Sequence, residues 1–341
     1  MAARLLRRQV LVAMAVGALA ACSGTSGSTS HASTATATAT ATVNPLAGTE
    51  FYVLPDSPAA LQVAQWTAEG DTAAAEQLAV VAEAPVATWF SGQHADPAAS
   101  AQELTTAAQA AGQVPVIVVY NVPGRDADHY SSGGAADADA YATWVAQVAA
   151  GIGDRPAVVV VEPDAVAQVV SGSATDVDAD ERYAALASAV GTFAALPSTT
   201  VYLDAGNSDW VSDLDALADA LWSSGIDDAD GFALNVSNFQ TTEDSLAYGE
   251  ELSAYLDGAH FVVDTSRNGA GATSRTDDPE AWCNPPTARI GVTPTTATGS
   301  DLADAYLWVK EPGTSDGDCR DGAPTAGTWW PEYALVLTSG T

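Results

Sequence analysis

Short apolar runs alternate with longer amphipathic stretches along most of the chain. From about Phe51 onward, runs of four to seven residues are rich in valine, isoleucine and aromatic residues. Continuous apolar runs of this kind are typical of strands buried on both faces, as in parallel sheets. The expected strands are Phe51–Leu54, Val86–Phe90, Pro115–Asn121, Ala157–Glu162, Thr200–Asp204, Gly231–Val236, Phe261–Asp264 and Ala305–Lys310.

The stretches between these runs are rich in alanine and have helical periodicity. They predict helices at Pro97–Ala111, Ala138–Gly151, Asp178–Ala195, Ser212–Ser224 and Glu243–Leu256. A strand-then-helix rhythm repeated in this way predicts an α/β fold with a barrel of mostly parallel strands, similar to a TIM barrel. We expect a single domain of this kind at residues 48–341.

The N-terminal segment, residues 1–21, is expected to be an export signal. Three arginines within the first eight residues precede an apolar run, Val10–Ala21, which is too short to span a bilayer. The run ends in Leu-Ala-Ala directly before Cys22, which resembles a bacterial lipobox and predicts a lipid at this cysteine. An ordinary signal with an incidental cysteine is the alternative.

Residues 22–47 change composition to serine, threonine, glycine and alanine, with an Ala-Thr repeat. Such a segment buries too little apolar surface to fold and predicts a flexible tether. Signal and tether together predict an extracellular protein, attached to the outer face of the cell membrane through Cys22.

Charge excludes several partners. The chain has 11 basic and 43 acidic residues. Without residues 1–21, which hold three of the basic residues, it carries 8 basic and 43 acidic residues, a net charge of −35. This charge argues against nucleic acid and against an anionic membrane surface, and favours a neutral ligand or a cation. Most of the aspartates are expected on a solvated surface.

Two cysteines remain besides Cys22, at Cys283 and Cys319. In an exported protein a disulfide is the default expectation. A metal site has little support, because no histidine lies near either cysteine and the four histidines have no metal-ligand spacing: His31, His94, His129 and His260.

Polar side chains end several predicted strands, at the edge where parallel barrels carry their active sites. One such residue occurs by chance, but a series in chain order predicts a site: Asn121, Glu162, Asp164, Asp204, Asn235, Asp264 and Lys310. Lys310 is the only lysine in the chain, which favours a ligand-binding role over a surface role.

Five motifs carry candidate chemistry, and each combines acids or amides with a tight turn. Pro163 fixes the backbone between two acids in one of them. Nine tryptophans are many for an alanine-rich chain, and aromatic faces stack on sugar rings, although core packing is the alternative for each. The motifs are Tyr120–Asp126 with Ser131–Gly134, Val161–Asp164, Tyr202–Trp210, Asp264–Gly269 and Trp308–Gly317.

In this order and spacing, the motifs resemble those of the family 6 glycoside hydrolases, cellulases that cleave β-1,4-glucan with inversion. The resemblance runs from about Phe51 to Tyr333. It implies a distorted barrel of mostly seven parallel strands, a β-glucan as the partner and no cofactor. The spacing between motifs is short, so we expect an open cleft and cleavage of internal bonds. We also expect a monomer.

The resemblance also implies roles for individual residues. Asp164 corresponds to the general acid, Asp126 to the aspartate that raises the pKa of the acid and helps to relay a proton, and Asp316 to the candidate base. Tyr120 corresponds to a tyrosine beside the distorted sugar at the cleavage point. The implied substrate-binding residues are Trp89, Asp204, Asn207, Trp210, Asn238, Trp282 and Lys310, and Cys283 and Cys319 correspond to a family disulfide.

Glycoside chemistry agrees with these roles. Cleavage passes through an oxocarbenium-like state and needs two carboxyl groups, one of them protonated near neutral pH. A nearby negative charge raises the pKa of a carboxyl, and Asp126 and Asp164 follow neighbouring strands.

Four positions depart from the family pattern: Ala127 replaces a cysteine, Asn207 a histidine, Thr241 a tryptophan and Thr314 a sugar-binding glutamate. Two alternatives to an endo-β-1,4-glucanase stay open, and Thr241 and Thr314 support the first of them. One is a glycan-binding lipoprotein without turnover, and the other is a hydrolase of another cell-envelope or plant glycan on the same fold.

Overall fold

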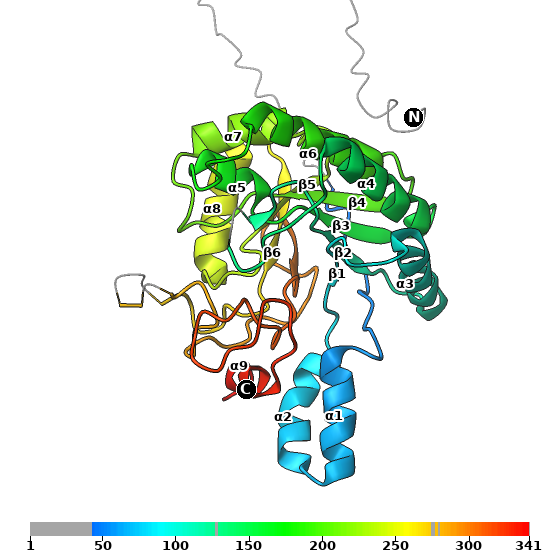
Figure 1. Ribbon diagram of the computed structural model, residues 1–341, viewed down its shortest axis with the longest axis vertical. Coiled ribbons are helices and arrows are strands. Elements are labelled where there is room, and N and C mark those ends of the chain that lie inside the picture. The colour runs from blue at the N-terminus through cyan, green and yellow to red at the C-terminus, as the bar shows by residue number, and fades with distance from the viewer. Residues whose placement is uncertain (1–42, 127–128, 274–276, 279, 341) are drawn as a thin grey trace, which may run out of the picture. The chain divides into compact units, whose positions relative to one another are not determined.

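Seven parallel strands form one sheet in which each strand pairs with the next along the chain (Figure 1). The computed structural model describes residues 43–126, 129–273, 277–278 and 280–340. The expected signal, Cys22, most of the expected tether and Ala127 lie outside the described residues. The strands are β1 (Thr88–Phe90), β2 (Val116–Val119), β3 (Ala157–Val161), β4 (Thr199–Asp204), β5 (Gly231–Leu234), β6 (His260–Asp264) and β7 (Ala303–Leu307).

The sheet curls until its two edge strands approach each other. Val86, just before β1, forms an isolated parallel bridge with Trp308, just after β7. The Ala87 N–H donates to the Trp308 carbonyl at 3.0 Å. The predicted α/β fold with a distorted parallel barrel is therefore confirmed.

The strand interiors are buried on both faces, which explains their unbroken apolar sequences. In β3, Val159 and Val161 pack toward the covering helices, while Val158 and Val160 pack toward the inside of the curl. All four side chains are fully buried. Successive side chains of a strand point to opposite faces, so both cores draw on one valine run.

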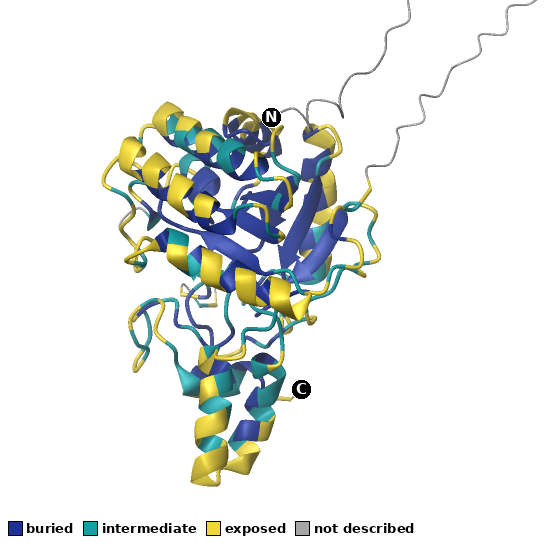
Figure 2. Cartoon of the chain, turned by 90° about the vertical axis from the view of Figure 1, so that its right-hand side faces the viewer, coloured by how far each residue is buried: buried dark blue, intermediate teal, exposed yellow. Residues whose placement is uncertain are grey.

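Helices cover the outer face of the sheet, and the sides of these helices that face away from it are exposed (Figure 2). An aspartate caps the N-terminus of several, as Asp96 does for α3, where its Oδ1 accepts from the Ala99 N–H at 2.9 Å. Some of the acidic excess thus serves helix capping. These helices are α3 (Pro97–Ala111), α4 (Ala138–Ile152), α6 (Ala179–Ala194), α7 (Leu214–Ser223) and α8 (Thr242–Tyr255).

Four further helices were not predicted, and one predicted strand is wrong. The helices are α1 (Pro58–Glu69) and α2 (Thr72–Ala82), which pack together, α5 (Ala165–Val170), and α9 (Pro331–Leu337), which contacts α2 (Figure 1). Phe51–Leu54 is not a strand, because only Phe51 forms a bridge, to Val114, and Pro55 follows the run. None of the described helices is long and apolar enough to cross a membrane.

The folded unit begins at Asn44, a few residues before the expected start at residue 48. The Asn44 side chain donates to the Asp304 carbonyl at 2.9 Å, and Leu46 is buried. The last residues of the expected tether are therefore attached to the edge of the sheet.

Candidate active site

A cleft of about 290 Å³ lies at the carboxyl ends of the strands. It brings together Asp126, Asp164, Asp316 and Tyr120, the four residues expected to take part in catalysis. It also contains six of the seven residues expected to bind substrate: Trp89, Asn207, Trp210, Asn238, Trp282 and Lys310. Strand-end residues separated by up to 227 positions in sequence (Trp89 to Asp316) thus share one site.

Asp164 follows β3 in a left-handed backbone conformation, with φ of 71°. Its N–H donates to Asp204 Oδ1 at 2.9 Å, which holds the turn between β3 and α5. The pKa of Asp164 is raised from 3.8 to about 7. Burial is the largest cause, the negative charges of Asp126 and Asp316 add to it, and the positive charge of Lys310 opposes it. The carboxyl is therefore partly protonated near neutral pH, as a general acid requires.

Asp126 lies on the loop after β2 and also has a positive φ, of 62°. Its Oδ2 accepts from the Ser131 N–H at 2.6 Å, and its Oδ1 lies 3.5 Å from the Gln168 amide nitrogen. Burial raises the pKa of Asp126, and the Ser131 N–H is the largest opposing influence. Asp126 in turn raises the pKa of Asp164, so the two carboxyls are an electrostatically linked pair.

Arg125 fixes the loop that carries Asp126. Its guanidinium donates to the Tyr120 carbonyl at 2.6 Å and to the Ser131 carbonyl at 2.9 Å. It also lies 4.6 Å above the Tyr120 ring, a cation–π contact. The Trp89 ring meets the Tyr120 ring edge to face, with centroids 5.3 Å apart, so both Arg125 and Trp89 restrain the Tyr120 ring.

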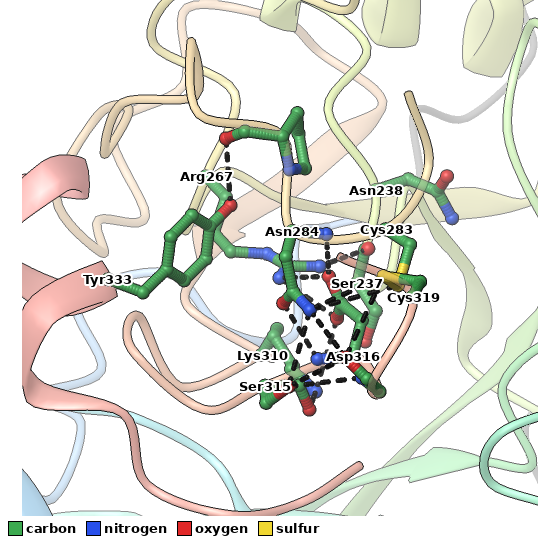
Figure 3. Close-up of polar contacts among 12 residues, drawn as sticks. Ser237, Asn238, Arg267, Cys283, Asn284, Lys310, Ser315, Asp316, Cys319 and Tyr333 are labelled. Carbon is green, nitrogen blue, oxygen red and sulfur yellow. Dashed lines mark hydrogen bonds and ion pairs between the residues drawn. A yellow bond between two sulfur atoms is a disulfide. The ribbon is translucent and has the colours of Figure 1, made fainter. Parts of the chain in front are cut away.

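Asp316 is tied to two cations (Figure 3). Arg267 Nη1 donates to both carboxylate oxygens, at 2.9 and 2.8 Å, and Lys310 Nζ lies 3.4 Å from Oδ1. The Asn284 N–H donates to Oδ2 at 2.9 Å. Burial raises the pKa of Asp316, but the two cations outweigh it, and its pKa lies below the ordinary value. Asp316 is therefore ionised and a weak proton acceptor.

Arg267 was not anticipated as part of this site. It is fully buried and donates to the Ser237 carbonyl (Figure 3). Its guanidinium also stacks over the Phe239 ring, 4.4 Å from the ring centroid. The sequence signal was available, because Arg267 lies in the Asp264–Gly269 motif. Its partner Asp316 is 49 residues away along the chain, and only the fold reveals the pair.

A disulfide joins Cys283 to Cys319, as expected. It links the loop that carries Trp282 to the loop that carries Asp316. Asn284 reinforces this link, since its side chain donates to the Gly317 carbonyl at 2.8 Å and accepts from the Asp316 N–H at 2.9 Å.

Asp204, expected to bind substrate, is not brought to the cleft. Its side chain is fully buried, and its Oδ1 accepts from the N–H groups of Asp164 and Gly206 at 2.9 and 3.0 Å. It lies behind the acid because the turn that starts α5 covers it. Burial raises its pKa well above the ordinary value, and Asp164 adds to this effect. The expectation of direct sugar contact by Asp204 is corrected to support of the Asp164 turn.

Other cleft residues lie outside the sequence-derived set. Tyr130 and His129 pack near Trp282, with ring centroids 5.9 and 6.0 Å away. Glu162, predicted as one of the strand-end residues of the site, is buried and does not line the cleft. It accepts from the Asn121 and Val122 N–H groups at 2.9 to 3.0 Å and so anchors the end of β2. Within the described part of the chain, no cluster of His, Cys, Asp and Glu side chains is suited to a metal ion.

Linked carboxyls between aromatic walls, at the carboxyl edge of a curled parallel sheet, are the arrangement of a glycoside hydrolase. The chain belongs to glycosyl hydrolases family 6, whose model matches residues 46–341. It is 41% identical over 300 residues to endoglucanase 1 of Streptomyces halstedii, covering 85% of this chain and 88% of that protein. It is 41% identical over 290 residues to endoglucanase A of Cellulomonas fimi, covering 84% of this chain but only 60% of that protein.

A solved structure is similar along the whole fold. The endoglucanase Cel6 from Mycobacterium tuberculosis, in complex with methyl-cellobiosyl-4-deoxy-4-thio-β-D-cellobioside, matches with a TM-score of 0.80 and 43% identity. The match covers 88% of this chain and 100% of that one.

Proposed function

We propose that this chain hydrolyses internal β-1,4-glucosidic bonds of cellulose or related soluble β-glucans, with inversion at the anomeric carbon. The observation that carries the proposal is a cleft acid, Asp164, whose pKa of about 7 keeps a proton available near neutral pH. Family membership and the endoglucanases among its relatives support the substrate class. The cello-oligosaccharide analogue bound by the Mycobacterium tuberculosis protein supports it further.

In the proposed reaction, the Asp164 carboxyl donates its proton to the glycosidic oxygen as the bond to the anomeric carbon breaks. The Tyr120 ring and the Lys310 ammonium line the cleft beside this acid and position the sugar there. A water molecule attacks the anomeric carbon from the opposite face, which inverts the configuration. Between loss of the leaving group and attack of the water, the sugar passes through an oxocarbenium-like state. This state carries positive charge, which the ionised Asp316 stabilises.

The water must lose a proton, and Asp126 is the better acceptor of the two remaining carboxyls. Proton affinity rises with pKa, and burial raises the pKa of Asp126 while the cations around Asp316 lower that of Asp316. We therefore propose Asp126 as the end of the proton relay, and Asp316, the candidate base from sequence, as a fixed negative charge.

Two adjoining cavities support internal cleavage. A second cavity adjoins the first and shares Trp89, Tyr120 and Lys310 with it. A long chain can therefore extend past the cleavage point in both directions, and Trp210 and Trp282 offer aromatic faces on the first side.

The decisive experiment measures reducing-sugar release by residues 44–341 from carboxymethylcellulose and from mixed-linkage β-glucan, with proton NMR of the first anomer formed. We expect α-configured product and a falling viscosity, and loss of both in Asp164→Asn. Activity on another glycan in a panel, with none on β-1,4-glucan, would establish the second hydrolase alternative. Binding of cello-oligosaccharides without release of any sugar would establish the non-catalytic alternative, which Thr241 and Thr314 favour.

We also propose that residues 1–21 are an export signal, that a lipid on Cys22 holds the enzyme outside the cell, and that residues 23–43 form the tether. The lipobox-like sequence supports the lipid, and the folded unit that starts at Asn44 supports the position of the tether. Labelling with a radioactive fatty acid should mark the full chain in a bacterial host but not Cys22→Ala. Sedimentation of residues 44–341 should give a monomer.

A further inference from the structure

The second cavity, of about 760 Å³, has chemistry of its own. It begins at the Trp89, Tyr120 and Lys310 boundary with the first cavity but contains none of the three carboxyls Asp126, Asp164 and Asp316. Glu311 and Thr314 line it instead. A glucan chain that passes the acid would therefore meet a different carboxylate in this cavity.

Glu311 is held in place by its neighbour on the same turn. Thr314 Oγ1 donates to Glu311 Oε2 at 2.7 Å, and the Thr314 N–H donates to the Glu311 carbonyl at 3.0 Å. Thr314 is itself fixed by an antiparallel bridge to Trp329. The other carboxylate oxygen, Oε1, has no hydrogen-bond partner among the described residues and is available to a ligand.

Two further groups make this wall suitable for a sugar ring. Lys310, next to Glu311 in sequence, lines both cavities and has one N–H donor left beyond its contacts with Asp316 and the Ser315 carbonyl. Trp89 donates its indole N–H to the Val309 carbonyl at 2.8 Å, which fixes the ring at the boundary. A carboxylate acceptor, an ammonium donor and a fixed aromatic ring are the groups that bind a polyhydroxylated pyranose.

We propose that Glu311, oriented by the Thr314 hydroxyl, is a substrate-binding residue that accepts hydrogen bonds from hydroxyls of a glucosyl unit in the second cavity. The inference rests on the proposed β-glucan function. It also explains how this chain keeps a carboxylate beside Lys310 although residue 314 is threonine. Glu311 supplies the carboxylate three residues earlier, and Thr314 donates a hydrogen bond to it.

The test is calorimetric titration of cellohexaose into Asp164→Asn, so that the ligand is not cleaved. Glu311→Leu in this background should weaken binding about tenfold, because hydrogen bonds to a charged group contribute more than neutral ones. Thr314→Val, which removes only the orienting hydroxyl, should weaken it about threefold. Adding Thr314→Glu to Glu311→Leu should restore affinity to within about threefold of the parent, since the carboxylate returns to the same wall.

The matched control is Glu103→Leu on the exposed face of α3, which makes the same change away from both cavities and should leave binding unchanged. If the parent binds cellohexaose and Glu311→Leu binds it equally well, the inference fails and the proposed function stands. A loss that Thr314→Glu does not restore would mean that residue 311 acts through packing, which also overturns the inference. If the parent binds no cello-oligosaccharide, the proposed function and the inference both fail.

Discussion

Replacing Asp126 by asparagine removes one negative charge beside Asp164 and keeps a side chain of nearly the same size. Asp126 is the second-largest cause of the raised Asp164 pKa, after burial. A like charge of this kind contributes roughly one pKa unit or more. We therefore expect the Asp164 pKa to fall from about 7 to about 6, and no further toward 3.8, because burial remains.

The pH dependence of kcat/KM on a soluble cello-oligosaccharide measures this change. The alkaline limb reports the acid that must stay protonated, so its midpoint should move from about pH 7 to about pH 6. The plateau should also fall by roughly 10²–10⁴-fold if Asp126 takes the proton from water. The position of the limb is independent of the height of the plateau, so the two effects can be separated.

Thermal stability provides a second, activity-free measurement. A carboxyl whose folded pKa is raised above its unfolded value stabilises the fold at low pH and loses that contribution as pH rises through the folded pKa. Asp126→Asn should therefore gain stability over the wild type near pH 8, by about 1.4 kcal/mol per pKa unit. Asp219→Asn, on the exposed face in the middle of α7, is the control and should change neither quantity. An alkaline limb that stays at about pH 7 in Asp126→Asn would refute the linked pair.

Three other changes test the surroundings of the site. Reducing the Cys283–Cys319 disulfide frees a loop of 36 residues and should lower the free energy of unfolding by about 4 kcal/mol, measured by denaturation with and without reductant. Arg267→Met removes the guanidinium nitrogen that donates to both oxygens of buried Asp316, and should cost about 3–5 kcal/mol of stability. It should also raise the Asp316 pKa, which would appear as a new acidic limb in kcat/KM. Burial raises the pKa of Glu162 from 4.5 to about 7, so Glu162 alone should account for a loss of roughly 3 kcal/mol of wild-type stability between pH 4.5 and 8. Glu162→Gln should lack this loss, and an equal pH dependence in both proteins would contradict it.

The fold was predictable where the apolar pattern and the capping residues indicate the same element boundaries. The α3 helix begins at the predicted Pro97, after an aspartate cap, and ends at the predicted Ala111, before Gly112 in a left-handed conformation. The α5 helix was not predicted, because six residues are too few for a helical period to emerge. Phe51–Leu54 has the composition of a strand, but composition does not show that only Phe51 in this run forms a bridge, to Val114.

The site was predictable as a series of polar residues at strand ends, but the contacts among them were not. Residues at strand ends converge in any parallel barrel, so Asp126, Asp164 and Lys310 could be grouped without a structure. Whether a strand-end acid faces the cleft depends on what covers it, and the turn before α5 covers Asp204. The Arg267 pair with Asp316 depends on how two distant loops are brought together, which local sequence does not encode.

The left-handed backbone of Asp126, Glu162 and Asp164 has an evolutionary consequence. Each of these residues has a conformation that glycine adopts more readily, and each buries a carboxyl whose pKa rises as a result. Mutation of Asp164 to glycine would remove both the backbone strain and the buried carboxyl. A lineage that only bound glycans would therefore be expected to accumulate such stabilising changes. Glu162 also anchors the end of β2, but Asp126 and Asp164 are kept at a cost in stability, and selection for turnover is the force that would hold these two acids there.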